Sequence, residues 1–138
     1  MVEFTKAVQR DLPLIFALNR ELIETYEDLT AIDLPRVLDW VERNLENHLG
    51  DFRRVLYAGE LVGFFCLSGG ELDSLFVLPQ FRGKGIGTAV IRYCQDISPA
   101  LFLYVFRENT RAAELYRRMG FQITKEVGKT RYIMEWRK

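Results

Sequence analysis

The residues best suited to chemistry begin in one glycine-rich stretch. LPQFRGKGIGT, at 78–88, contains three glycines together with Arg82 and Lys84. Glycines let successive backbone N–H groups point into one concavity, with no side chain to block a close ligand. The stretch lies between a run typical of a strand and one typical of a helix, whose N-terminus adds about half a positive charge. These features favour an anion site that suits a pyrophosphate; the alternative is a glycine-rich turn with solvated cations.

Two common phosphate-binding motifs do not fit. The dinucleotide motif G-x-G-x-x-G, started at Gly83, needs a third glycine where the chain has Thr88. The P-loop motif G-x-x-x-x-G-K-[ST] finds its tail at 128–130, but its first glycine would fall at Ile123, in a segment typical of a hairpin. The pattern that remains is R-x-x-G-x-G, at Arg82, Gly85 and Gly87.

A second stretch, NTRAAELYRRMGF at 109–121, is typical of a capped amphipathic helix. Asn109 suits the N-cap, and Gly120 suits the left-handed position beyond the C-terminus. The apolar side of this helix is formed by Ala112, Leu115, Tyr116 and Met119.

Together the two stretches resemble motifs of the GNAT superfamily of acyl-CoA-dependent N-acyltransferases. LDSLFVLPQFRGKGIGT resembles the acyl-CoA motif of that family, with its R/Q-x-x-G-x-G/A loop. NTRAAELYRRMGF resembles the companion motif N-x-x-A-x-x-L-Y-x-x-x-G-F, which is complete here. The resemblance is specific over residues 61–123, whereas the N-terminal helices carry no recognisable signature.

The resemblance implies a binding mode for acetyl-CoA as co-substrate. The strand before the loop would pair its backbone with the pantetheine arm, the loop would hold the pyrophosphate, and the sheet would splay so that the thioester fits between two strands. Asn109 would hydrogen-bond the pantetheine, act as a plain helix N-cap, or do both. The residues expected to bind the co-substrate are Leu75, Phe76, Val77, Arg82, Gly83, Lys84, Gly85, Ile86, Gly87, Thr88 and Asn109.

The resemblance also implies catalytic roles. Tyr116 would donate a proton to the departing thiolate; the alternative is an ordinary core tyrosine. Glu71 and Asp73 project from one face of their strand by its period of two, in a region where the family places a general base, sometimes acting through water. An alkylammonium must lose a proton before it can attack, and we favour Glu71 for this role. The alternative is that both are solvated charges at the start of the strand.

Strand and helix patterns alternate along the whole chain. Strands are expected at 2–7, 53–58, 61–68, 71–77, 101–106, 121–127 and 130–136, and helices after Asp11, after Asp33, from Ile86 and after Asn109. Gly59-Glu60 suits a two-residue type II′ hairpin, and LFLYVF at 101–106 is typical of a strand buried on both faces. The order β-α-α-β-β-β-α-β-α-β-β predicts an α+β, GNAT-like three-layer fold. Its sheet would be mixed, mostly antiparallel and six- to seven-stranded, with about four flanking helices in one domain, 1–138.

Composition narrows the function classes. The 138 residues carry 19 basic and 19 acidic side chains, so the chain as a whole has no basic field for nucleic acid. No apolar run approaches 18 residues, which argues against a membrane span. Cys66 and Cys94 are expected to be unpaired thiols of a cytoplasmic protein. His48 is the only histidine, so neither a metal site nor a histidine-activated nucleophile is expected.

The acceptor is the least defined part of the prediction. The pocket should lie between the two N-terminal helices and the splayed strands, with Trp40 as pocket wall or core. An acidic run there, Glu21, Glu24, Glu27 and Asp28, would attract a cationic amine or simply form a solvated helix face. The leading prediction is an N-acetyltransferase, monomeric or homodimeric, acting on a primary amine of a small molecule or protein. The alternative is a non-catalytic domain that senses acyl-CoA or scaffolds partners.

Overall fold

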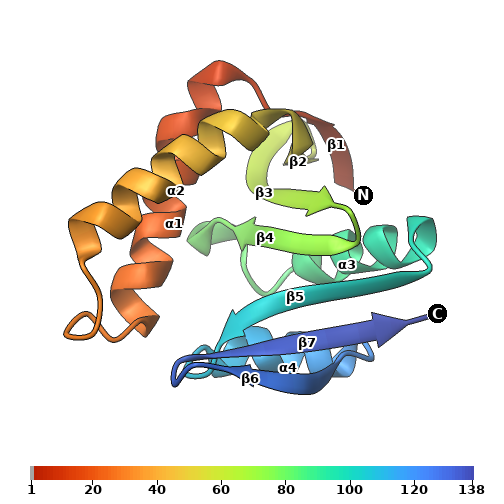
Figure 1. Cartoon of the computed structure of the whole chain (residues 1–138). Coiled ribbons are helices and arrows are strands. Elements are labelled where there is room, and N and C mark those ends of the chain that lie inside the picture. Colours follow the sequence, from red (N-terminus) through yellow and green to blue (C-terminus); the bar gives the residue numbers. More distant parts are fainter. Residues whose placement is uncertain (1) are drawn as a thin grey trace.

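The computed structural model describes residues 2–138, which form seven strands and four α-helices around one sheet (Figure 1). The strands are β1 (Val2–Lys6), β2 (Phe52–Tyr57), β3 (Glu60–Ser68), β4 (Glu71–Val77), β5 (Ala100–Phe106), β6 (Gln122–Val127) and β7 (Arg131–Arg137). The helices are α1 (Leu12–Tyr26), α2 (Leu34–His48), α3 (Ile86–Ile97) and α4 (Thr110–Arg118). The expected element order and fold class are confirmed.

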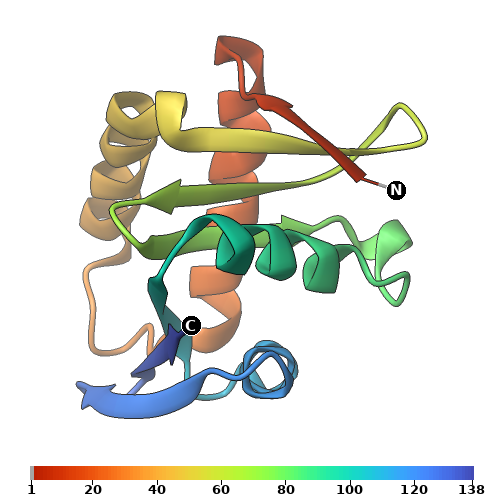
Figure 2. The ribbon, with the colours of Figure 1, turned by 90° about the vertical axis from the view of Figure 1, so that its right-hand side faces the viewer.

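The sheet has the order β1-β2-β3-β4-β5-β7-β6 and is antiparallel except between β4 and β5. These two parallel strands share a single registered pair, Glu71 with Phe102, supported by a 3.0 Å hydrogen bond from Phe102 N–H to the Gly70 carbonyl. Beyond that pair they diverge, and both views of the ribbon show the gap (Figures 1 and 2). The expected splay of the sheet is therefore present.

Helices α1 and α2 cover one face of the first half of the sheet. Both carry a proline in the first turn, and Asp33 caps α2 by accepting a hydrogen bond from Arg36 N–H. Asp11 before α1 is buried instead: it accepts from Val8 N–H at 2.8 Å and lies 3.4 Å from Arg54 Nε. The core under these helices is formed by Ile15, Val41, Leu45, Phe52, Phe64 and Cys66.

Helices α3 and α4 cover the opposite face and make the larger core. Its buried side chains come from α3 (Val90, Cys94), α4 (Tyr116) and the sheet (Leu103, Met134), among others. Gly120, beyond the end of α4, has φ +95°, the left-handed conformation expected of it. The three layers are thus helices, sheet and helices, as the α+β prediction required.

Strand β4 carries a bulge at Asp73. Ser74 pairs with Cys66 and Leu72 with Leu67, so Asp73 is the extra residue opposite no partner. A bulge bends its strand, increases the local twist and interrupts the period of two. The strand is therefore deformed next to the point where it parts from β5.

The β2–β3 hairpin differs from the expected turn. Its central residues are Ala58 and Gly59, with φ +52° and +80°, rather than Gly59 and Glu60. Two positive φ values define a type I′ turn, so the type II′ prediction is wrong and one residue out of place. The type I′ twist matches that of the flanking strands, which explains why it forms even with an alanine in the left-handed region.

Two further expectations concern the environment of the chain. Cys66 and Cys94 are both buried and unpaired, as predicted. Within residues 2–138, none of the helices has the length and apolar character that crossing a membrane requires.

Candidate active site

The glycine loop leaves the end of β4 and delivers the chain to α3. Gly83 and Gly85 have φ +78° and +79°, and a Cβ at either position would meet no atom within 4 Å. Gly85 is the N-cap residue of α3, so its neighbours present N–H groups at the positive end of the helix dipole. The loop has the backbone geometry and open space that an anion cradle needs, and only glycine adopts it without strain.

Arg82 also connects the loop to β4 through a hydrogen bond. Its Nε–H donates to the Val77 carbonyl at 3.2 Å, which ties the loop back to the last residue of β4. This bond uses one of five guanidinium N–H groups, so the charge stays available to an anion. Gly87 is needed for packing, because a Cβ there would lie 3.2 Å from Leu115 Cδ2 of α4.

Strand β4 offers an unpaired backbone edge in front of the loop. Leu75 and Val77 pair with Phe65 and Gly63 of β3 on one side, whereas the side toward β5 has no registered partner after Glu71. Backbone N–H and C=O groups on such an edge can pair with an extended chain. The pantetheine arm carries amide groups suited to that pairing, so the residues present fit the co-substrate.

Tyr116 lies on the α4 side of the sheet, with only 9% of its surface exposed. Burial, and secondarily the nearby Cys94, raises the pKa of its phenol well above the ordinary value. The Phe121 ring packs against it with the centroids 5.6 Å apart. Tyr116 is therefore a core residue. Its hydroxyl group stays protonated at neutral pH, which is the state that a proton donor needs.

Asn109 caps α4. Its Oδ1 accepts from Ala112 N–H at 3.4 Å, and its own N–H donates to the Phe106 carbonyl at 3.0 Å. The N-cap interpretation is confirmed. Because the cap uses the side-chain oxygen, the amide NH₂ remains able to donate to a ligand.

Glu71 and Asp73 come together at the bulge of β4. Glu71 is half-buried, and its pKa is raised first by burial, then by the charge of Asp73 and by a hydrogen bond with that carboxyl group. Asp73 is exposed at the bulge. A carboxylate whose pKa is raised toward neutrality is a stronger base, so this pair can accept a proton from an ammonium group.

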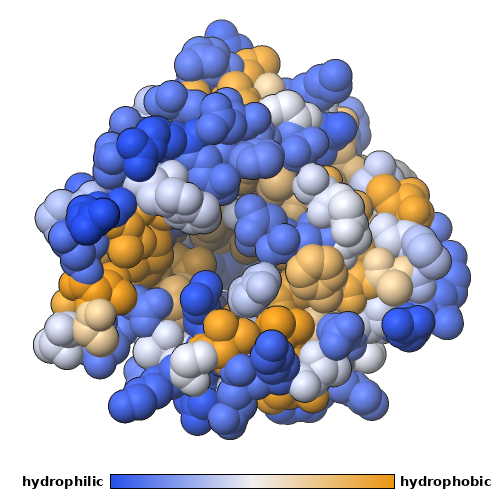
Figure 3. Space-filling model, in the orientation of Figure 1, coloured by the Kyte–Doolittle hydropathy of each residue, from blue (hydrophilic) through white to orange (hydrophobic). Residues whose placement is uncertain are grey.

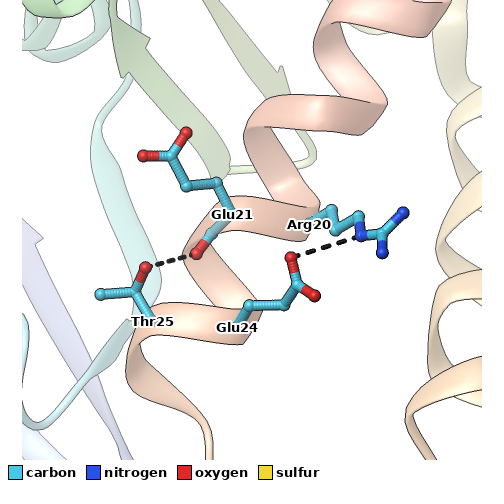
Figure 4. A network of polar contacts seen from close by, with 4 residues as sticks. All are labelled: Arg20, Glu21, Glu24 and Thr25. Carbon is cyan, nitrogen blue, oxygen red and sulfur yellow. Dashed lines mark hydrogen bonds and ion pairs between the residues drawn. The ribbon is translucent and has the colours of Figure 1, made fainter.

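The acidic run at the end of α1 does not act as one cluster. Glu24 pairs with Arg20 at 3.3 Å, Glu27 accepts from Asp28 N–H, and Asp28 accepts from Thr30. Glu21 differs: Figure 4 shows its carboxylate leaving α1 on the side opposite to the Arg20–Glu24 pair, where the strand ribbons lie. Glu27 and Asp28 line a cavity at the end of α1, so these two carboxylates and Glu21 face different surroundings.

Trp40 is on the surface of α2, with 59% of its area exposed. It belongs to neither core, so the predicted core role is wrong. It lines neither of two cavities near α1, and its role as a wall of the acceptor pocket stays a prediction. One of these cavities, of about 320 Å³, lies between α1 and α2 and is lined mainly by Leu12, Pro13, Phe16 and Leu45. It contains no predicted site residue.

The other cavity, of about 390 Å³, was not foreseen. It joins the end of α1 (25–28), the β5–α4 turn (107–108) and the β6–β7 turn (129–130). Arg107 stands beside it, 3.5 Å from Glu126 and with its guanidinium 4.9 Å from the Tyr132 ring centroid. These segments lie far apart in the sequence, so no local motif could have indicated the cavity.

Strand β5 also differs from expectation. Leu101, Leu103 and Val105 are buried, but Tyr104 is 45% exposed and Phe102 only half-buried. The prediction of a strand buried on both faces is therefore wrong. Because the sheet splays, α1 and α2 cover only its first half, and the space-filling view shows a hollow on this face (Figure 3).

Comparison with known proteins agrees with this geometry. The profile of the acetyltransferase (GNAT) family matches residues 15–121. Among curated proteins, the peptidyl-lysine N-acetyltransferase YjaB of Salmonella typhimurium is 40% identical over 65 residues, which cover 47% of this chain and 45% of that protein. YjaB of Escherichia coli is 31% identical over 107 residues, covering 78% of this chain and 65% of that protein. The matches thus span about half to two thirds of the length of these relatives.

Among solved structures, a PaiA N-acetyltransferase from Thermoplasma acidophilum in complex with coenzyme A superimposes with a TM-score of 0.73. The match covers 100% of this chain and 99% of that one, at 21% sequence identity. At this identity the likeness establishes the fold.

Proposed function

Since the chain belongs to the GNAT acetyltransferase family, we propose that it transfers an acetyl group from acetyl-CoA directly to a primary amine, with residues 1–138 working as one domain. One observation carries this proposal. The sheet opens between β4 and β5 after a single pair, and the open edge of β4 leads straight into a glycine loop at the N-terminus of α3. An extended chain ending in a pyrophosphate matches both parts.

In this proposal the edge of β4 pairs with the pantetheine arm and the loop holds the pyrophosphate. Leu75, Phe76 and Val77 supply backbone groups on the strand, and Asn109 donates its side-chain amide from the opposite wall. The remaining contacts come from the loop and the first turn of α3, namely Arg82, Gly83, Lys84, Gly85, Ile86, Gly87 and Thr88. Acetyl-CoA, when bound, supplies the activated acetyl thioester.

The side chains of this protein then move two protons. Glu71, paired with Asp73, accepts a proton from the acceptor ammonium directly or through water, because an amine of pKa about 10 is protonated at neutral pH and cannot attack. Tyr116 gives its phenolic proton to the thiolate that leaves. Its burial supports this role, since an ionised phenolate would have no proton to give. No covalent intermediate with the protein is needed, and burial raises the pKa of Cys66 and of Cys94 to about 12.

The acceptor is a primary amine of a protein or of a small molecule. The two YjaB relatives are named for peptidyl-lysine, which supports a lysine-type amine here as well. The unpaired thiols Cys66 and Cys94 support a cytoplasmic location, where thiols stay reduced.

The decisive test separates donor binding from turnover. Calorimetry should detect acetyl-CoA binding, and a thiol-release assay against a panel of primary amines should detect coenzyme A production that depends on the amine. Amine-dependent release above the rate of acetyl-CoA hydrolysis supports the enzyme. Tight binding without release from any amine would point to the sensor or scaffold alternative, and absence of binding would refute both.

A further inference from the structure

The face of β5 and β7 that α1 and α2 leave uncovered carries a stripe of aromatic side chains. Leu101, Leu103 and Val105 point into the core beside α3 and α4, so Phe102, Tyr104 and Phe106 project from the opposite face. None of these three belongs to either core. In Figure 1 no helix crosses in front of β5 or β7, so the stripe faces the open side of the splay.

Two of the three rings already have a partner. Tyr26, from the end of α1, stacks on Phe106 with centroids 6.2 Å apart. The Arg131 guanidinium lies over the Tyr104 ring, 5.6 Å from its centroid. Phe102 stands at the narrow end of the splay, where β4 and β5 still pair, and is half-buried outside both cores.

Phe102 is flanked by carboxylates on both sides. It pairs with Glu71 of β4 and with Glu135 of β7, so the three side chains form one row across the sheet on one face. Directly opposed residues have Cβ atoms about 4.5–5.5 Å apart, which is within reach of one small ligand.

Other charges on this face extend the pattern. The charge of Asp73, at the bulge, lies close enough to Glu71 to raise its pKa, and the Glu21 side chain leaves α1 on the side where the strand ribbons lie. The cations on these strands lie in other rows: Arg131 over Tyr104, Arg137 opposite Ala100, and Lys125 opposite Ile133. The row containing Phe102 is therefore an apolar ring between acidic groups, with no cation of its own.

This arrangement selects among primary amines. An aromatic face attracts both methylene groups and a cation, and flanking carboxylates attract an ammonium group. The same carboxylates repel an acceptor that carries its own carboxylate on the carbon bearing the amine. The row thus suits an ammonium at the end of an unbranched aliphatic stem.

We propose that the acceptor is an alkylammonium whose methylene stem lies on Phe102 and whose charged end sits between Glu71 and Glu135. Phe102 and Glu135 are then specificity-determining residues, in addition to the base. This inference rests on the proposed acetyltransferase function and adds the two residues that select a stem-borne amine. A lysine side chain and a free diamine share this chemistry, and the assay distinguishes them.

The first experiment compares acceptors on the full chain with saturating acetyl-CoA. Nα-acetyl-lysine methylamide offers a stem-borne amine on a peptide unit, cadaverine offers the same stem free, and Nε-acetyl-lysine offers only an amine beside a carboxylate. The first two should show kcat/KM at least tenfold above the third, and the better of the two identifies the source. If Nε-acetyl-lysine is the best acceptor, the inference is overturned while the acetyltransferase function stands. If no amine is acetylated although acetyl-CoA binds, the proposed function fails, and the inference with it.

The second experiment tests the two residues. Along the series from ethylamine to pentylamine, each methylene in contact with Phe102 should lower KM by up to about fourfold. A plot of log KM against chain length therefore has a negative slope, which Phe102→Ala should bring closer to zero. The slope compares acceptors within one variant, so partial loss of folded protein does not alter it.

Glu135→Gln should raise the KM for cadaverine roughly threefold or more and leave the KM for acetyl-CoA unchanged. Glu60→Gln, an exposed carboxylate in the β2–β3 hairpin, is the matched control. An unchanged slope in Phe102→Ala, or equal effects of Glu135→Gln and Glu60→Gln, contradicts the proposal.

Discussion

Replacing Gly85 by alanine should both strain the backbone and weaken coenzyme A binding. Gly59→Ala is the matched control, because it should strain the backbone without affecting binding. Gly85 in the loop and Gly59 in the β2–β3 hairpin have φ +79° and +80°, and a Cβ at either site would meet no atom within 4 Å. The backbone cost of Gly85→Ala and Gly59→Ala should therefore be the same, about 1–2 kcal/mol each. No steric term distinguishes the two positions.

That cost translates into a measurable melting shift. With an unfolding entropy of about 2.1 cal/mol/K per residue, a chain of 138 residues loses about 3–4 °C of Tm per kcal/mol. Both variants should thus melt about 3–7 °C below the wild type in the absence of ligand. Differential scanning calorimetry of the two variants checks this equality.

Coenzyme A binding should separate the two variants. The open space at Gly85 is the space proposed for the pyrophosphate, so a methyl group there keeps the anion away from the loop N–H groups. We expect the Kd for coenzyme A to rise at least tenfold in Gly85→Ala, about 1.4 kcal/mol, and not to change in Gly59→Ala. Isothermal titration calorimetry measures both. Equal affinities in the two variants, with equal loss of Tm, would refute the assignment of the loop to the pyrophosphate.

Three further variants test catalysis and stability. Tyr116→Phe should lower kcat by about 10²–10⁴-fold with an unchanged Kd for coenzyme A, and wild-type turnover would remove Tyr116 from the mechanism. Glu71→Gln should lower kcat/KM and remove from its pH profile the step that belongs to titration of this carboxyl group. The same variant should also raise Tm at pH 7. Folding raises the pKa of the Glu71 carboxyl group, so this group stabilises the protein below its unfolded pKa and loses that contribution as pH rises through the folded pKa. Glutamine does not ionise, so the variant does not suffer this loss. A lower Tm at pH 7 would contradict this sign. Ala58→Asn should stabilise the type I′ hairpin by about 0.5–1 kcal/mol, because asparagine tolerates the left-handed φ of +52°; chemical denaturation that shows no gain would argue against backbone strain there.

The parts of the fold that were predictable are those encoded by local chemistry. Prolines in the first turns, the Asp33 and Asn109 caps and the left-handed Gly120 each fix a helix end through neighbouring residues. The glycine loop belongs to the same class, since its backbone conformation depends on a few adjacent positions. These features needed no knowledge of what packs against them.

The features that could not be predicted depend on contacts between distant segments. The apolar run of β5 does not reveal that one of its faces is left uncovered, because that depends on how far α1 and α2 reach over the sheet. The bulge at Asp73 arises from pairing with β3, and the cavity beside Arg107 joins three separate turns.

The single pair between β4 and β5 has a consequence for the lifetime of the protein. Strands β1–β4 and strands β5–β7 are two half-sheets joined directly by one registered pair, and the core under α3 and α4 contains residues of both. A ligand bound in the gap adds a further link between them. A ligand that binds only the folded chain stabilises it by RT ln(1 + [L]/Kd), about 2.7 kcal/mol at one hundred times Kd. Bound acetyl-CoA or coenzyme A should therefore raise the Tm of the chain and slow its proteolysis.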